Sequence, residues 1–300
     1  MTQTRIIHKV TRSKPTLEGA GVHLRRAFGF GDTQLYDPFL LLDDFRGDKR
    51  EDYIQGFPWH PHRGIETITY VLEGEVEHGD NMGNKGIIGA GDMQWMTAGS
   101  GIIHQEMPHG APNGHMYGFQ LWANLPRSHK MMPPRYQEVK SSQIPQVDLP
   151  GGGLMRVICG KVGEVKGPIQ DVMVEPEYLD ISLPPEGSLV HPTIRGHTVF
   201  AYVFAGDGIF CGENDPFAYE TEGSNYFDTE RCSSLGNTSL IVFEDGDQIQ
   251  VNAGGTGMRF LLISGKPLHE PVAWYGPIVM NTSAELQTAF EELQNDTFIK

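Results

Sequence analysis

Two short segments carry histidines at a spacing that could bind a metal ion. The first is His60-Pro61-His62, and the second is His104-Gln105-Glu106. In a β-strand, residues i and i+2 point to the same face. If the two strands lie side by side, three imidazoles and one carboxylate converge. That donor set suits Fe, Mn, Ni, Cu, Co or Zn.

A second carboxylate leaves the fourth ligand open at this point. Glu66 lies four residues beyond His62, so an uninterrupted strand would place both on one face. Spacing alone therefore admits either Glu66 or Glu106 beside the three histidines.

Short strands joined by turns must position these residues. Gly and Pro together make up 57 of 300 residues (37 plus 20) and are dispersed between short β-branched runs such as Ile65–Leu72. This pattern is typical of β-sandwiches and β-barrels. Only residues 283–293 have helical spacing, with Ser283 as the expected N-cap. The sequence predicts an all-β fold with a short C-terminal helix.

The chain contains two copies of one unit. Tyr70–Gly74 aligns with Tyr202–Gly206, an offset of 132 residues. In the second copy, Pro192 and Ile194 occupy the places of the first two histidines. The second copy thus keeps the strand pattern without the candidate ligands. This contrast favours a metal-binding role for the histidines of the first copy.

Proline and glycine also mark the predicted domain boundaries. We expect a metal-binding domain over residues 1–130, a Pro/Gly-rich linker over 131–153, and a domain without metal ligands over 154–300. An acidic insertion at 212–235 in the second copy is predicted to be a surface loop.

Composition excludes several classes of protein. With 23 Lys+Arg against 38 Asp+Glu, the net charge of −15 disfavours direct nucleic-acid binding, which needs a cationic face. No apolar run reaches about 18 residues, so we expect no membrane span. The N-terminal segment lacks a secretory h-region, and the three cysteines are sparse. A cytoplasmic location is the expectation.

Longer segments around these residues resemble the two cupin motifs and, more specifically, the pirin family. The matching segments are DPFLLLDDF (37–45), GFPWHPHRGIET (56–67), TAGSGIIHQEMP (97–108) and PLHEPVAWYGPIVMNT (267–282). The resemblance covers nearly the whole chain. It implies a bicupin, in which two tandem jelly-roll barrels pack face to face and only the N-terminal barrel holds metal.

The resemblance also implies a ligand set and an activity. The family's ligands fall on His60, His62, His104 and Glu106, and the metal is typically Fe(II). Glu66 is then expected to hydrogen-bond a ligand histidine. Bacterial members are associated with quercetin 2,3-dioxygenase activity, which implies a flavonol and O2 as substrates. Glu106 or Glu66 is a candidate acceptor for the proton of the substrate hydroxyl, the alternative being a ligand with no proton role. Animal members are transcription co-regulators, so the alternative is a non-enzymatic, redox-sensitive iron-binding module with a protein partner.

Neighbours of the motifs complete the predicted site. Arg63 is expected to pair with Asp43 or Asp44, the alternative being an anchor for an anionic substrate. Six apolar residues lie near the motifs and belong either to the pocket wall or to ordinary core: Phe57, Trp59, Met93, Trp95, Met107 and Phe119.

Overall fold

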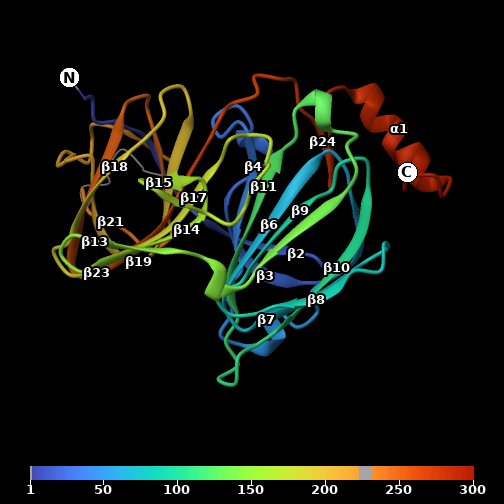
Figure 1. Ribbon diagram of the computed structural model, residues 1–300, viewed down its shortest axis with the longest axis horizontal. Helices are drawn as coiled ribbons and strands as arrows, with labels where there is room; N and C mark the ends of the chain where they lie inside the picture. The colour runs from blue at the N-terminus through green and yellow to red at the C-terminus, as the bar shows by residue number, and fades with distance from the viewer. Residues whose placement is uncertain (1, 223–231) are drawn as a thin grey trace. The chain divides into compact units, whose positions relative to one another are not determined.

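Two compact units make up the chain. In the computed structural model, which describes residues 2–222 and 232–300, one unit comprises Lys14–Gln143 and Leu268–Lys300. We call this unit the first barrel. The other unit, the second barrel, comprises Met1–Ser13 and Ile144–Pro267. Strands dominate both units, as Figure 1 shows, which confirms the all-β prediction.

These units differ from the predicted domain boundaries. Residues 1–13 join the second barrel, and residues 268–300 join the first. The stretch expected to be a linker, 131–153, instead contributes strands to both units. Within it, β12 (Arg135–Val139) pairs with β9 (Met93–Thr97) of the first barrel, and β13 (Gln146–Leu149) pairs with β14 (Gly153–Cys159) of the second. Its prolines and glycines lie mostly in the turns between these strands, so their density misplaced the boundary.

The first barrel contains a seven-stranded sheet and a four-stranded sheet, both antiparallel. The larger sheet has the order β12-β9-β6-β11-β4-β3-β2, with β2 (Lys14–Glu18), β3 (Val22–Phe28), β4 (Phe39–Asp44), β6 (Ile65–Glu73) and β11 (Tyr117–Asn124). The smaller sheet has the order β5-β10-β7-β8, with β5 (Phe57–His62), β7 (Glu75–Asp80), β8 (Lys85–Ile88) and β10 (Ile102–His109). Four 3-10 turns accompany these strands: η1 (Phe30–Asp32), η2 (Arg50–Asp52), η3 (Arg127–His129) and η4 (Ser141–Gln143).

The C-terminal segment returns to the first barrel. It forms the hairpin of β24 (Ala273–Tyr275) and β25 (Ile278–Met280), followed by the helix α1 (Ser283–Gln294), which lies beside that hairpin in Figure 1. The N-cap of α1 is Thr282 rather than Ser283, because the Thr282 hydroxyl accepts from the Glu285 amide at 3.2 Å. The Glu285 carboxylate in turn accepts from the Thr282 amide at 2.9 Å, which completes a capping box.

The second barrel is built mainly on one ten-stranded sheet. Its remaining strands are β1 (Ile7–Arg12), β17 (Glu177–Leu183), β18 (Ser188–Pro192), β19 (Thr198–Phe210), β20 (Glu220–Thr221), β21 (Leu235–Gly236), β22 (Ser239–Phe243) and β23 (Gln248–Gly265). A small hairpin, β15 (Lys161–Val162) and β16 (Val165–Lys166), stands apart from that sheet. Of the acidic insertion expected at 212–235, residues 223–231 lie outside the described residues.

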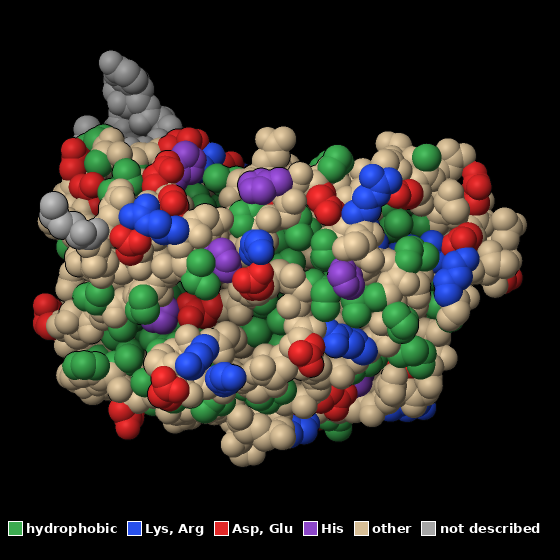
Figure 2. All heavy atoms as spheres, turned by 45° about the horizontal axis from the view of Figure 1, so that its top comes forward, with side chains coloured by type: hydrophobic (Ala, Val, Ile, Leu, Met, Phe, Trp, Pro, Cys, Tyr) green, Lys and Arg blue, Asp and Glu red, His purple; other side chains and the backbone are tan. Residues whose placement is uncertain are grey.

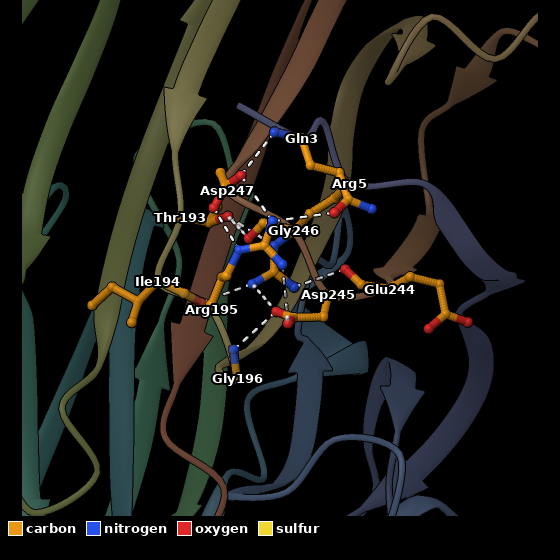
Figure 3. Close-up of polar contacts among 10 residues, drawn as sticks. All are labelled: Gln3, Arg5, Thr193, Ile194, Arg195, Gly196, Glu244, Asp245, Gly246 and Asp247. Atoms are coloured by element: carbon orange, nitrogen blue, oxygen red, sulfur yellow. Dashed lines mark hydrogen bonds and ion pairs between the residues drawn. The ribbon is translucent and has the colours of Figure 1, made fainter. Parts of the chain in front are cut away.

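A buried arginine joins the N-terminal segment to two loops of the second barrel (Figure 3). Arg5 is 1% exposed and donates to Thr193 Oγ1 at 2.7 Å and to the carbonyls of Ile194 and Glu244, each at 2.8 Å. Beside it, Arg195 donates to Asp247 Oδ1 at 2.6 Å. The loop at 193–196 in this barrel is therefore held in two ways. Arg5 donates to its backbone and to Thr193, and Arg195 within the loop pairs with Asp247.

The molecular surface carries mixed charges. On the face drawn in Figure 2, acidic side chains lie among basic and hydrophobic ones. No helix among the described residues is long and apolar enough to cross a bilayer.

Candidate metal centre

Three histidines converge inside the first barrel. His60 and His62 lie on β5 and His104 on β10, and the two strands pair with His104 opposite His60. One ring nitrogen from each histidine lies within 4.8 Å of the other two. The Nε2 atoms of His60 and His62 are 3.0 Å apart. The structure thus brings together the three imidazoles that the strand spacing selects.

The separation of the first two nitrogens suits a single ion. Two ligands at about 90° to one another, with metal–nitrogen bonds of ~2.1 Å, are about 3 Å apart. The Nε2 atoms of His60 and His62 have this separation.

Backbone carbonyls orient two of the three rings. His60 Nδ1 lies 2.8 Å from the Pro58 carbonyl, and His62 Nδ1 lies 3.1 Å from the Pro277 carbonyl. Because a carbonyl can only accept, each Nδ1 carries the proton and each Nε2 keeps its lone pair for a metal. Pro277 belongs to the C-terminal segment, which therefore helps to fix a ligand 215 residues earlier.

His104 provides a test of whether the site fits a metal. The residue is 1% exposed, yet neither ring nitrogen has a hydrogen-bond partner among the described residues. Buried polar atoms in folded proteins are almost always bonded. An ion beside His104 would supply the missing partner, so the donor set fits a bound metal.

The surroundings keep two of these rings neutral. Burial lowers the pKa of His62 well below its usual range, and the nearby His60 and His104 lower it further. Burial also lowers the pKa of His104, with added contributions from His60 and His78. Metal ligation requires the neutral imidazole, so both rings are in the binding form at neutral pH.

Glu106 lies on the same buried face of β10 as His104, as the strand spacing predicts. Its carboxylate lies outside the cluster formed by the three histidines. It accepts from Thr69 Oγ1 at 3.0 Å and from Gln120 Nε2 at 3.0 Å. Glu106 is thus two residues from His104 along β10, and its carboxylate is held by two neutral donors.

Glu66 faces away from the centre. Thr69 contacts Glu106, and Thr69 is three positions after Glu66 on β6, so the two side chains lie on opposite faces. Thr97 Oγ1 donates to Glu66 at 2.6 Å, and burial raises the pKa of that carboxyl. The expected hydrogen bond from Glu66 to a ligand histidine is therefore wrong. The counting from His62 fails because Gly64, at φ +78°, separates β5 from β6.

A cavity of about 580 Å³ lies beside His60 and His62. Its wall is rich in aromatic side chains, among them Phe57, Trp59, Trp122 and Trp274. The rings of His62 and Trp122 meet edge to face with centroids 5.1 Å apart, and Trp122 lies 5.9 Å from Trp274.

Only part of this wall follows from the sequence. Phe57 and Trp59 line the cavity, which was one of the two alternatives for them. Trp95 instead pairs directly with Ile68, on the face of the sheet opposite Thr69. Met93 shares the face of Trp95, and Phe119 pairs directly with Tyr70 on that same face. Trp122 and Trp274 were missed. The alternation of Gln120 with Trp122 on one strand could have indicated the first, but Trp274 lies in the segment assigned to the other domain.

Arg63 forms an ion pair, but not with the expected partners. Its guanidinium donates to Glu292 Oε2, the Ser100 carbonyl and the Phe298 carbonyl, each at 2.7 Å. As the neighbour of His62, its side chain points away from the cavity and toward the C-terminal segment. The two carboxylates expected to bind it pair with other arginines: Asp43 with Arg26, and Asp44 with Arg46.

Asp43 lies on the cavity wall. Arg26 donates to its two oxygens at 2.9 and 2.7 Å. Burial nevertheless raises the pKa of Asp43 to about 6, because desolvation outweighs the effect of the arginine.

Two cupin domains, one with a histidine cluster inside its barrel, define a bicupin with a candidate metal centre in the first barrel. Residues 21–123 match the family model for Pirin, and residues 178–299 match the Pirin C-terminal cupin domain. The chain is 40% identical over 295 residues to a pirin-like protein of Caulobacter vibrioides, covering 98% of this chain and 99% of the relative. The protein belongs to the pirin family.

Solved structures agree with this assignment. A quercetin 2,3-dioxygenase from Acinetobacter baumannii superposes with a TM-score of 0.84 at 30% identity, covering 99% of both chains. The bacterial pirin YhhW of Escherichia coli, solved in complex with nickel(II), has the same fold, with a TM-score of 0.64 at 20% identity. That alignment covers 87% of this chain and 100% of YhhW.

Proposed function

We propose that this protein is a metal-dependent dioxygenase that uses O2 to open the ring of a flavonol such as quercetin. The observation that carries the proposal is the cluster of three histidines at the wall of an aromatic cavity. The similarity to the quercetin 2,3-dioxygenase of Acinetobacter baumannii supports the reaction type.

The cavity suits a flat phenolic substrate. Trp122 and Trp274 present indole rings beside His62, and ring pairs of this kind favour stacked or edge-to-face contacts. At about 580 Å³, the cavity falls within the range of small-molecule sites. A flavonol lying against these rings would bring its oxygens toward the histidines.

We propose Fe(II) as the metal, with His60, His62 and His104 as ligands and Glu106 as the fourth. When bound, the ion would supply Lewis acidity that makes the substrate hydroxyl more acidic. Glu106 would accept the released proton at a carboxylate oxygen. Thr69 and Gln120, which now donate to that carboxylate, would keep it oriented on the inner face of β10.

Turnover by the iron-loaded protein tests the reaction. Oxygen uptake and carbon monoxide release are expected with quercetin after Fe(II) loading. His104→Ala should lose both bound iron and turnover, because it removes one of three imidazole ligands. Absence of turnover by fully loaded wild-type protein would overturn the proposed reaction for that substrate.

A pair of glutamate variants separates the two carboxylates. Glu106→Gln should lower the affinity for iron and reduce turnover, because the amide is a poor ligand and cannot accept the proton. Glu66→Gln makes the same change at a carboxylate that lies on the face of β6 opposite Thr69, so this variant should retain iron and turnover. Equal loss in both variants would contradict the assignment of Glu106.

A further inference from the structure

The first barrel contains a second, smaller cavity of about 20 Å³ on the far side of Glu106 from His104. Most of its wall is apolar and includes Val22, Phe45, Phe57, Val76, Pro108 and Met116. Five of these six residues belong to or pack against one hydrophobic cluster of the barrel. The cavity is thus a gap in an apolar core.

The polar side chains on this wall already have partners. Glu106 accepts from Thr69 and Gln120, and Asp43 accepts twice from Arg26. Gln120 Oε1 accepts from Trp122 Nε1 at 3.2 Å, and the Tyr53 hydroxyl donates to the Gly114 carbonyl at 2.7 Å. A water molecule needs two to four polar partners to be held in a cavity. Here every side-chain donor is already engaged, so a water could bond only by donating to side-chain oxygens such as those of Glu106 and Asp43.

The cavity lies one strand step beyond the ligands. His104, Glu106 and Pro108 alternate along β10 and all face inward. Successive inward residues are about 6.8 Å apart along the strand. Pro108, in the cavity wall, is therefore as far from Glu106 as Glu106 is from His104. Glu106 therefore stands between the histidine cluster and the cavity.

The two cavities adjoin without being the same space. Asp43, Phe57 and Gln120 line both of them, whereas His60 and His62 line only the larger. A substrate in the larger cavity would reach the histidines from one side and leave the smaller cavity open to a different molecule on the other.

We propose that the smaller cavity is a binding site for dioxygen. Its volume is enough for one small molecule, and its wall is mostly apolar with every side-chain donor engaged, which suits an apolar diatomic gas. This inference rests on the proposed dioxygenase function, because it supplies the second substrate of that reaction. Oxygen would wait beside Glu106, out of the path by which the phenolic substrate enters.

Paramagnetic relaxation by dissolved oxygen tests the site without any turnover. Under oxygen pressure, the methyl group of Met116 in the cavity wall should relax faster than that of Met155. Both residues are 1% exposed, and Met155 lies in the core of the second barrel. Equal relaxation of the two methyl groups would overturn the proposal, whatever the protein's activity.

Matched variants then link the site to the cavity. Val76→Ile should fill the space and abolish the excess relaxation at Met116, whereas Val76→Ala should enlarge the space and increase it. Val71→Ile adds the same methyl group within the same cluster, but outside the cavity wall, and should leave the excess unchanged. Loss of the excess in Val71→Ile as well would show a general packing effect and contradict the site.

Kinetics of the iron-loaded protein separate this inference from the proposed function. Val76→Ile should raise the KM for oxygen by about threefold or more and leave the KM for the flavonol unchanged. An unchanged KM for oxygen would overturn the role in oxygen supply. Absence of flavonol turnover in the wild type would overturn the proposed function, while the relaxation of Met116 would still report whether oxygen binds.

Discussion

The four candidate ligands have different surroundings, which decide what each can do. His60 and His62 are oriented by backbone carbonyls, His104 is buried without a described partner, and Glu106 is held by two donors. Alternation along a strand predicts that the histidines converge, because His60 and His62 lie on one strand and His104 and Glu106 on another. It gives the wrong face for Glu66 because a turn at Gly64 separates the two strands.

A buried lysine that contacts the turn after β5 should make stability depend on pH. Lys130 Nζ donates to the Asn124 side chain at 2.7 Å and to the carbonyls of Gly64 at 2.9 Å and Val279 at 3.1 Å. Burial lowers the pKa of Lys130 from 10.5 to about 7. Between these values the unfolded chain binds more protons than the folded one, so the free energy of unfolding should rise as pH increases from 7 to 10.

Urea unfolding of the wild type and Lys130→Met at pH 7, 8, 9 and 10 measures this effect. The variant should be less stable throughout, because three buried oxygens lose their donor. The wild type should gain stability relative to the variant as pH rises. A constant difference across this range would mean that Lys130 keeps its ordinary pKa in the folded protein.

At the scale of elements, the metal centre depends on strands distant in sequence. β5 and β10 supply the candidate ligands, while β25 runs beside the turn after β5, where Arg63 pairs with Ile278. Local patterns predict that strands and a helix exist, because burial and turn residues are local properties. They do not determine which barrel a strand joins, so the predicted boundaries differ from the compact units, in which residues 268–300 belong with the first barrel.

The contact of Arg63 with this segment should hold the ligand turn in place. Arg63 is 2% exposed and joins Ser100, on the loop before β10, to Glu292 and Phe298. Arg63→Met should weaken metal affinity by about 10- to 100-fold, as the loss of supporting contacts does at other metal sites. Competition with a chelator of known affinity measures the change.

Arg127→Met is the matched control for that variant. Arg127 also pairs with a glutamate of α1, Glu285 at 3.5 Å, but its side chain is 66% exposed. Exposed pairs contribute little, so metal affinity should stay close to that of the wild type. A similar loss in both variants would indicate that the helix as a whole, rather than the Arg63 contact, supports the metal centre.

At the scale of the whole molecule, two related barrels differ in what occupies the same turn. The first barrel places His62-Arg63-Gly64 there, and the second places Ile194-Arg195-Gly196, held by Arg5 and Asp247. No second cluster of metal-ligating side chains occurs among the described residues. The internal repeat predicts a second barrel without the candidate ligands, because Pro192 and Ile194 stand at the positions of His60 and His62.

Arg5→Met should therefore affect stability without affecting the metal. The substitution leaves the Ile194 and Glu244 carbonyls and the Thr193 hydroxyl without their donor, which should cost roughly 2–5 kcal/mol of stability in the second barrel. Calorimetry should show a lower melting temperature, and metal analysis should still give one ion per chain. Loss of the ion in this variant would contradict a centre confined to the first barrel.

The exchange of terminal segments between the barrels has a consequence for biosynthesis. The ribosome makes β5 and β10 long before it makes Pro277, whose carbonyl orients His62, and before α1, whose Glu292 binds Arg63. During translation, a nascent first barrel therefore lacks part of the frame around its histidines until residues 268–300 emerge. A metal ion would meet the complete frame only after residues 268–300 have emerged, and a gene fragment ending near residue 143 would encode the candidate ligands without their support.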